Sequence, residues 1–213
     1  SGSGKSTIGK ICLGILRPTS GTALFEGEPI YHVGRRRPGS LAAVLQHPEW
    51  SMNPRLTIGR SIAEPLRVLK ADAARCQQRV KEMLASVGLP AATGDRYPHE
   101  LSGGQRQRAS IARALITQPK LIVFDEAVSA LDVSVQAQIL NLVRELQKEA
   151  GFAALFISHD VAAARYVSQR LAVLRDGLLQ EIASAAQFYL PMSNAYVYQL
   201  QVASGVIGSE HDH

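Results

Sequence analysis

Four consecutive apolar residues at 121–124, followed directly by Asp125 and Glu126, constrain the fold of this chain most strongly. An apolar run without polar alternation predicts a strand that is buried on both faces, as in a parallel sheet covered by helices. A helical pattern follows it at 135–146, and a second strand-like run follows at 152–157. The sequence therefore predicts an α/β protein with a mainly parallel sheet flanked by helices.

The remaining patterns divide the chain into a core and an insertion. Strand signals vanish between residues 48 and 117, which predicts an inserted helical subdomain within a core made of residues 1–47 and 118–213. We expect helices on the apolar stripes at 8–16, at 58–69 (interrupted by Pro65) and at 80–87 (closed by Gly88), short strands at 23–25 and 41–45, and a strand pair turning at 176–177.

Composition excludes several classes of protein. The 213 residues are 46% hydrophobic and 19% charged, as in one globular domain, and no apolar run is long enough to cross a membrane. Two cysteines are too few for a disulfide framework and favour a reducing compartment. The net charge of +5 does not require a nucleic-acid partner. We interpret its densest cluster, Arg35 to Arg37, as a solvated loop.

A phosphate-binding loop opens the chain. Ser1-Gly2-Ser3-Gly4-Lys5-Ser6-Thr7 matches the second half of the G-x-x-x-x-G-K-[ST] pattern, in which backbone amides surround an anion at the start of a helix. Lys5 would then reach the β- and γ-phosphates, and Ser6 would bind Mg²⁺. The first glycine of the pattern would precede residue 1, so we interpret the chain as a piece that lacks its N-terminus. A glycine-serine linker before a helix is the alternative.

Two carboxylates follow residues 121–124 and could act together with the phosphate-binding loop. Ligands of parallel sheets bind beyond the carboxyl ends of the strands, so Asp125 and Glu126 are expected beside the phosphates. Asp125 can hold Mg²⁺ and Glu126 can polarise an attacking water. A solvated turn after a strand is the alternative for these two residues, and the phosphate-binding loop makes it less attractive.

Residues 101–105, Leu-Ser-Gly-Gly-Gln, precede another helical pattern. Ser102 and Gln105 fit a capping box, which alone would explain a well-formed helix start. Two glycines inside the cap lower helix stability by roughly 1 kcal/mol each relative to alanine. They allow close approach to an anion, so Gly103 and Gly104 indicate a second phosphate-binding helix end.

Leu101 to Gln105 resembles the signature motif of ABC-type ATPases, a family with a P-loop (RecA-like) core. Other segments resemble further motifs of that family in the expected order: Gln46 its glutamine loop, residues 129–132 (Ser-Ala-Leu-Asp) its D-loop, and residues 157–160 (Ile-Ser-His-Asp) its switch histidine. The resemblance implies two nucleotide-binding domains packed head to tail. Each ATP would lie between the phosphate-binding loop of one subunit and the signature helix of the other.

The resemblance also implies a role for each residue. Gln46, Glu126 and His159 would be catalytic, with Glu126 as general base and His159 holding the γ-phosphate. Mg²⁺ would be held by Ser6, Gln46 and Asp125. Nucleotide would be bound by residues of both helix ends and of the D-loop: Ser1, Gly2, Ser3, Gly4, Lys5, Ser6, Thr7, Ser102, Gly103, Gly104, Gln105 and Asp132.

Residues 46–58 and 132–138 are similar to the oligopeptide, dipeptide and nickel importers within this family. That similarity implies an ATP-hydrolysing subunit at the cytoplasmic face of the plasma membrane. Its partners would be a second ATPase subunit, transmembrane permease subunits and, indirectly, a solute-binding protein, with no nucleic acid. Ala127-Val128 departs from the Pro-Thr usual in the family and should alter the turn after Glu126. The alternative is a soluble ABC-type ATPase that acts in DNA maintenance or on ribosomes.

Overall fold

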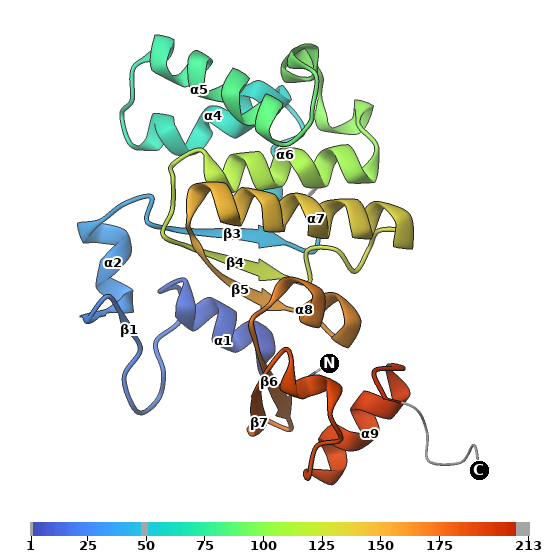
Figure 1. Cartoon of the computed structure of the whole chain (residues 1–213). Coiled ribbons are helices and arrows are strands. Elements are labelled where there is room, and N and C mark those ends of the chain that lie inside the picture. The colour runs from blue at the N-terminus through green and yellow to red at the C-terminus, as the bar shows by residue number, and fades with distance from the viewer. Residues whose placement is uncertain (1, 48–50, 208–213) are drawn as a thin grey trace.

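A three-stranded parallel sheet lies at the centre of the computed structural model, which describes residues 2–47 and 51–207 (Figure 1). The strands β3 (Leu41–Leu45), β4 (Leu121–Asp125) and β5 (Ala153–Ile157) pair in that order. Their register aligns Leu45 with Asp125 and Asp125 with Ile157. The residues that follow each strand therefore meet at one edge of the sheet, which we call the carboxyl edge.

Helices cover both faces of this sheet because side chains alternate along its strands. Helix α1 (Lys5–Cys12) lies on one face, where Gly9 approaches Val123 of β4. Helices α6 (Gly103–Leu115) and α7 (Val133–Ala150) cover the other face, and their apolar residues share the main core with Ile122 and Phe124. Figure 1 draws α1 below the strands and α6 and α7 above them. The predicted α/β architecture is confirmed.

The segment between β3 and β4 is helical, as expected. It contains α4 (Ile58–Val68), α5 (Ala73–Ser86), the 3₁₀ turns η1 (Ala91–Asp95) and η2 (Pro98–Glu100), and α6, with no strand in its described residues. Its buried residues join those of the sheet in one continuous core. The boundaries at residues 47/48 and 117/118 therefore remain a prediction.

Helix α4 is not interrupted by Pro65 but continues to Val68. Proline removes a helical hydrogen bond and disfavours a helix interior. Here Ile62 and Leu66 on either side of Pro65 are buried in the main core, and this packing outweighs the local preference.

Helix α1 is shorter than its apolar stripe predicted. It ends at Cys12, and Gly14 follows with φ +69°. A Cβ at Gly14 would lie 2.8 Å from the carbonyl oxygen of Ile30, so only glycine fits at this turn after the helix. Ile15 and Leu16 are consequently 72% and 42% exposed and do not continue the helix.

The arginine cluster is not a loop. Strands β1 (Leu24–Phe25) and β2 (Glu28–Pro29) form a hairpin, and α2 (Ile30–Arg36) follows it directly. Arg36 and Arg37 pair with Glu28, and Arg37 also pairs with Glu26. These acidic partners precede the arginines by eight to eleven residues and lie opposite them in the folded chain.

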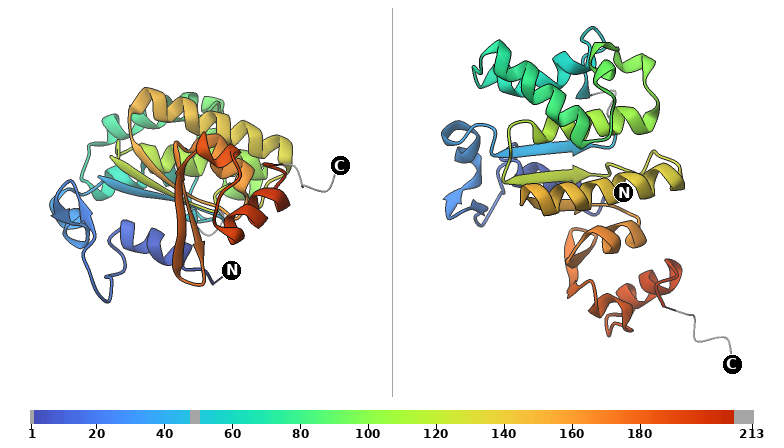
Figure 2. Two further views of the ribbon diagram at one scale, coloured as in Figure 1. Left: turned by 60° about the horizontal axis from the view of Figure 1, so that its bottom comes forward. Right: turned by 45° about the horizontal axis from the view of Figure 1, so that its top comes forward.

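The last elements build a second, smaller core. They are α8 (Val161–Val167), the antiparallel pair β6 (Arg170–Arg175) and β7 (Leu178–Ser184), η3 (Gln187–Tyr189) and α9 (Ala195–Ala203). Leu171, Phe188 and Val197 are buried together there. Figure 2 shows this part and the α4–α5 helices on opposite sides of the sheet layer. Within the described ranges, no helix has the length and apolar character needed to cross a bilayer.

Candidate functional site

The start of α1 has the backbone of an anion-binding loop. Gly2 and Gly4 have φ values of +91° and +90°, a region that glycine adopts without strain. Gly4 is the N-cap of α1, and the Lys5 ammonium donates a hydrogen bond to Ser3 Oγ over 2.8 Å. Thr7 is exposed in the first turn of the helix. Ser1 lies outside the described residues.

The loop meets the end of β4 through one direct contact. Ser6 Oγ donates to Asp125 Oδ1 over 3.2 Å, although 119 residues separate them. Both residues stand at the carboxyl edge, where the sequence placed them. A hydroxyl and a carboxylate at this distance are the oxygen ligands that Mg²⁺ prefers in proteins.

Glu126 is held by its backbone in a left-handed conformation with φ +51°. Its N–H donates to the carbonyl oxygen of Ile157 over 2.9 Å. Its own carbonyl oxygen accepts from Ser129 twice, from the N–H at 3.1 Å and from Oγ at 2.9 Å. A non-glycine residue in this region costs free energy and persists only where its surroundings impose it. Ser129 provides part of that restraint, a role that the sequence did not reveal.

The Ala127-Val128 pair packs into the core at the turn after Glu126. Both residues are buried, with 2% and 3% of their surface exposed, and both belong to the main core. Whether this turn differs from that formed by Pro-Thr stays a prediction.

His159 completes the cluster from the next strand. Its Nδ1 lies 3.4 Å from Glu126 Oε2, and its side chain is 64% exposed while that of Glu126 is 27% exposed. A hollow of about 420 Å³ adjoins His159, and Ser3 and Lys5 are also among its lining residues. The structure therefore brings Lys5, Ser6, Asp125, Glu126 and His159 to one place.

Gln46 directly follows β3, whose last residue, Leu45, pairs with Asp125. It is half-buried at the carboxyl edge. Its position is one residue beyond the Leu45–Asp125 pair, and its role as the glutamine of the site stays a prediction.

The second helix end is well capped. Ser102 Oγ accepts from Gln105 N–H over 3.3 Å, and Gln105 Oε1 accepts from Ser102 N–H over 3.0 Å, so the predicted capping box is present. A Cβ at Gly104 would lie 2.7 Å from Cγ1 of Val135, so this glycine is required for packing of α6 on α7. A Cβ at Gly103 would make only an ordinary contact, 3.5 Å from Leu131.

The two helix ends lie at the same edge of the sheet but on opposite faces. Helices α1 and α6 both begin at the end to which the strand arrows point in Figure 1, with the sheet layer between them. Ser102 to Gln105 therefore lie against the start of α7 and not against the phosphate-binding loop of their own chain.

Asp132 caps α7. Its carboxylate accepts from Val135 N–H over 3.0 Å and from Ser134 Oγ over 2.8 Å. The Val135 amide, followed by the Ser134 hydroxyl, holds the pKa of Asp132 below its ordinary value. Asp132 is therefore anionic at neutral pH, at the start of α7.

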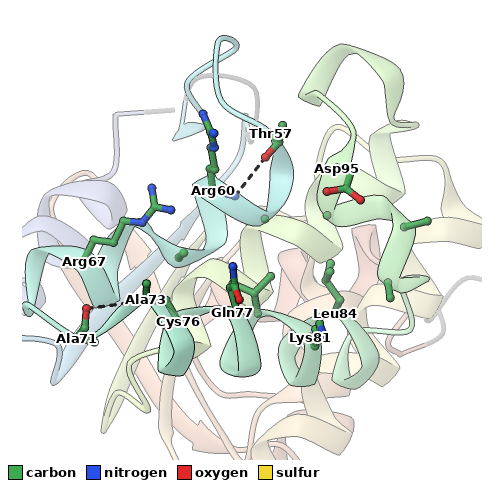
Figure 3. Close-up of a pocket in the computed structure, with 16 residues that line it drawn as sticks. Thr57, Arg60, Arg67, Ala71, Ala73, Cys76, Gln77, Lys81, Leu84 and Asp95 are labelled. Carbon is green, nitrogen blue, oxygen red and sulfur yellow. Dashed lines mark hydrogen bonds between the residues drawn. The ribbon is translucent and has the colours of Figure 1, made fainter.

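A larger hollow lies elsewhere. It measures about 800 Å³ between α4, α5 and η1, and its lining includes Arg60 and Arg67 from α4 and Lys81 from α5 (Figure 3). It contains none of the predicted site residues, so cavity size does not locate the chemistry here. Among the residues that the structure describes, no three His, Cys, Asp or Glu side chains cluster as a metal site.

Comparisons with known proteins agree with the geometry. A family model described as ABC transporter matches residues 1–129. The oligopeptide transport ATP-binding protein OppF of Bacillus subtilis (strain 168) is 44% identical over 89% of the chain, and the OppF of Haemophilus influenzae is 40% identical over 95%. The chain spans 64% and 63% of the length of these two relatives.

Two solved structures have the same fold. Clostridium perfringens cbiO1, part of the ABC transporter complex cbiONQ, has a TM-score of 0.80 and 25% identity, covering 95% of this chain and 80% of its own. The dimeric post-hydrolysis state of the ATP-binding cassette MJ0796, bound to ADP and Pi, has a TM-score of 0.73 and 27% identity. The match covers 86% of this chain and 81% of the MJ0796 chain.

Proposed function

Because the chain belongs to the ABC transporter family, we propose that it is the ATP-hydrolysing subunit of a peptide importer. The names of its relatives support a peptide as the transported solute, since both OppF proteins are oligopeptide transport ATP-binding proteins. Nickel, the other solute that the sequence resemblance allowed, has no such support among these names.

One observation carries the proposal: Ser6 contacts Asp125, and the next residue, Glu126, lies 3.4 Å from His159. Amides at the start of α1 and the Lys5 ammonium would neutralise the β- and γ-phosphates of ATP. Ser6 and Asp125, with Gln46, are oxygen donors that fit Mg²⁺. The ion, when bound with ATP, neutralises charge that develops on the phosphates. Within the described chain few protein ligands gather here, so nucleotide oxygens would complete the coordination.

Glu126 is suited to take the proton of the attacking water. Its carboxylate lies at the carboxyl edge, and its backbone is fixed by Ile157 and Ser129, so the base is oriented before ATP arrives. His159, 3.4 Å from that carboxylate, would hold the γ-phosphate and align the water with Glu126. The residues supply positioning and charge stabilisation, which account for most of the catalysis of phosphoryl transfer.

A second copy or a paralogous subunit would complete each site. The start of α6 lies across the sheet from the phosphate-binding loop of its own chain, so Ser102 to Gln105, together with Asp132, would bind the ATP held by the partner. The MJ0796 cassette, a chain of the same fold, is dimeric in its state bound to ADP and Pi, which supports this arrangement.

In this transport role the chain would lie at the cytoplasmic face of the membrane. The helices between residues 51 and 117 would transmit closure and opening of the ATPase dimer to permease subunits, through the segment after Gln46. A solute-binding protein would deliver the peptide. The membership of cbiO1 in a transporter complex supports an assembly of this kind.

Glu126→Gln in the complete gene product tests the proposal. The amide keeps the size of the side chain but cannot accept the proton, so we expect ATP binding and an ATP-induced dimer to persist while the steady-state turnover of ATP falls by at least about 100-fold. Glu149→Gln makes the same change at an exposed position late in α7 and should hydrolyse ATP at the parent rate. A Glu126→Gln protein with parental turnover would show that the base is assigned wrongly.

A further inference from the structure

The side chain of Gln136 joins two segments that the proposed function treats separately. Gln136 lies in the first turn of α7, and its Nε2 donates to Asp160 Oδ2 over 3.0 Å. Asp160 directly follows His159 in the sequence. One hydrogen bond therefore connects α7 to the residue next to the histidine of the site.

Asp160 makes three hydrogen bonds, one through each carboxylate oxygen and one through its backbone N–H. Its Oδ1 accepts from Ala163 N–H over 3.0 Å and thereby caps α8, while its own N–H donates to Ser158 Oγ over 2.9 Å. Gln136 satisfies the other carboxylate oxygen. Because Asp160 is half-buried, loss of one donor would leave a poorly solvated charge and shift the segment that carries His159.

The same turn of α7 also contacts the start of α6. Val135, the neighbour of Gln136, occupies the space that a side chain on Gly104 would need. Asp132 caps this turn through the N–H of Val135. A movement of the α6 start against α7 would therefore be transmitted to Gln136 without an intervening loop.

We propose that Gln136 is a positioning residue, which sets the place of His159 through Asp160 and ties it to the signature end of α6 in the same chain. The inference rests on the proposed function, since it links the helix end that serves the partner's ATP to the histidine that serves the chain's own. Closure of the α6 start onto the partner's ATP would thus change the position of His159 at the ATP that the chain itself holds.

A neutral amide suits this place better than its alternatives. Glutamate at position 136 would set a second carboxylate against Asp160, and like charges at hydrogen-bond distance repel. Asparagine is one methylene shorter and would not reach. Alanine would remove the donor and leave the helix intact, since alanine is the best helix former.

The experiment compares Gln136→Ala and Gln136→Glu with Gln138→Ala in the complete gene product. Gln138 is the matched control: it is a glutamine of the same helix, exposed, and it contacts Arg108 instead of Asp160. We expect kcat to fall about 10- to 100-fold in Gln136→Ala, as for a misplaced catalytic group, and further in Gln136→Glu. The KM for ATP should change less than about twofold in both, and Gln138→Ala should match the parent.

A second readout does not depend on turnover. In nucleotide-free protein, the ring ¹H–¹⁵N signals of His159 should move in Gln136→Ala and stay in place in Gln138→Ala. If the histidine signals and kcat of Gln136→Ala both match those of Gln138→Ala, the positioning role is refuted. The proposed function still stands in that case, provided that the parent protein hydrolyses ATP. If the parent itself hydrolyses no ATP, the proposed function fails, and His159 signals that respond to Gln136 would still support the link.

Discussion

Gly104 and Val135 are in such close contact that a methyl group on the glycine would lie 2.7 Å from Cγ1 of the valine. This contact fixes the start of α6 on the first turn of α7. The contact explains why glycine is needed at position 104 whether or not an anion binds there. Gly103, by contrast, has room for a side chain.

Gly104→Ala should therefore destabilise the protein although alanine favours a helix. Valine is branched at Cβ and cannot swing away, so overpacking should cost about 1–3 kcal/mol of unfolding free energy, more than the gain in helix propensity of about 1 kcal/mol. Gly103→Ala should be neutral or slightly stabilising. Urea unfolding of both variants checks this. Addition of Val135→Ala to Gly104→Ala should recover part of the loss, and equal stability of the two glycine variants would contradict the packing argument.

Ser129→Ala should lower turnover without loss of ATP binding. The change removes the hydroxyl that donates to the carbonyl oxygen of Glu126, a hydrogen bond of about 1 kcal/mol, and loosens a strained backbone. We expect kcat to fall about three- to tenfold. The control is Ser129→Thr, which retains the hydroxyl and should stay near the parent value. Steady-state kinetics of ATP hydrolysis measure this difference in kcat. A parental kcat in Ser129→Ala would show that Glu126 needs no such restraint.

Gln201→Leu should destabilise the C-terminal core. Gln201 is fully buried, donates to the carbonyl oxygens of Phe188 and Leu190, and accepts from Met192 N–H. Leucine would leave these three backbone groups without their partner, at a cost of about 2–4 kcal/mol. Hydrogen exchange in α9 measures this, and Gln199→Leu, exposed on the same helix, should change protection by less than about 0.5 kcal/mol. Equal exchange rates in the two variants would refute the role of Gln201.

The pKa of Glu26 should depend on Lys120. A hydrogen bond from Lys120 Nζ, 2.6 Å from Glu26 Oε1, is the main cause that lowers this pKa, and the charges of Lys120 and Arg37 add to it. Because the pKa of Glu26 is lower in the folded state, its ionised carboxylate stabilises the folded protein at any pH above the ordinary carboxyl pKa. This stabilisation is lost as the pH falls through the lowered pKa of the folded state. In Lys120→Met the pKa should rise toward 4.5, measured by carboxyl ¹³C NMR, whereas Lys148→Met should leave it unchanged. An unmoved Glu26 pKa in Lys120→Met would contradict this assignment.

The sheet and its helices could be predicted because their signals are local. Residues 41–45 form the expected strand to the residue, and Ser102 with Gln105 forms the expected capping box. The failures have tertiary causes. Arg36 ends α2 and Arg37 caps it, and both pair with acidic residues of the preceding hairpin. Helix α4 continues through Pro65 because Ile62 and Leu66 are buried.

The candidate site was predictable only in part for the same reason. The phosphate-binding loop, Asp125, Glu126 and His159 carry motif patterns, and the fold brings them together. Ser129 and Gln136 do not reveal their contacts in the sequence, because a hydrogen bond to a carbonyl oxygen or to a carboxylate 24 residues away leaves no periodic signal. Gln201 is similarly indistinguishable from the exposed glutamine two residues earlier.

The placement of α1 and α6 on opposite faces of one sheet has a kinetic consequence. If each triphosphate requires one helix end from each of two chains, a solitary molecule in dilute solution has only half of what catalysis demands. The initial velocity per molecule should then climb with protein concentration until the molecules associate fully. Tethering two copies with a flexible linker should abolish that dependence.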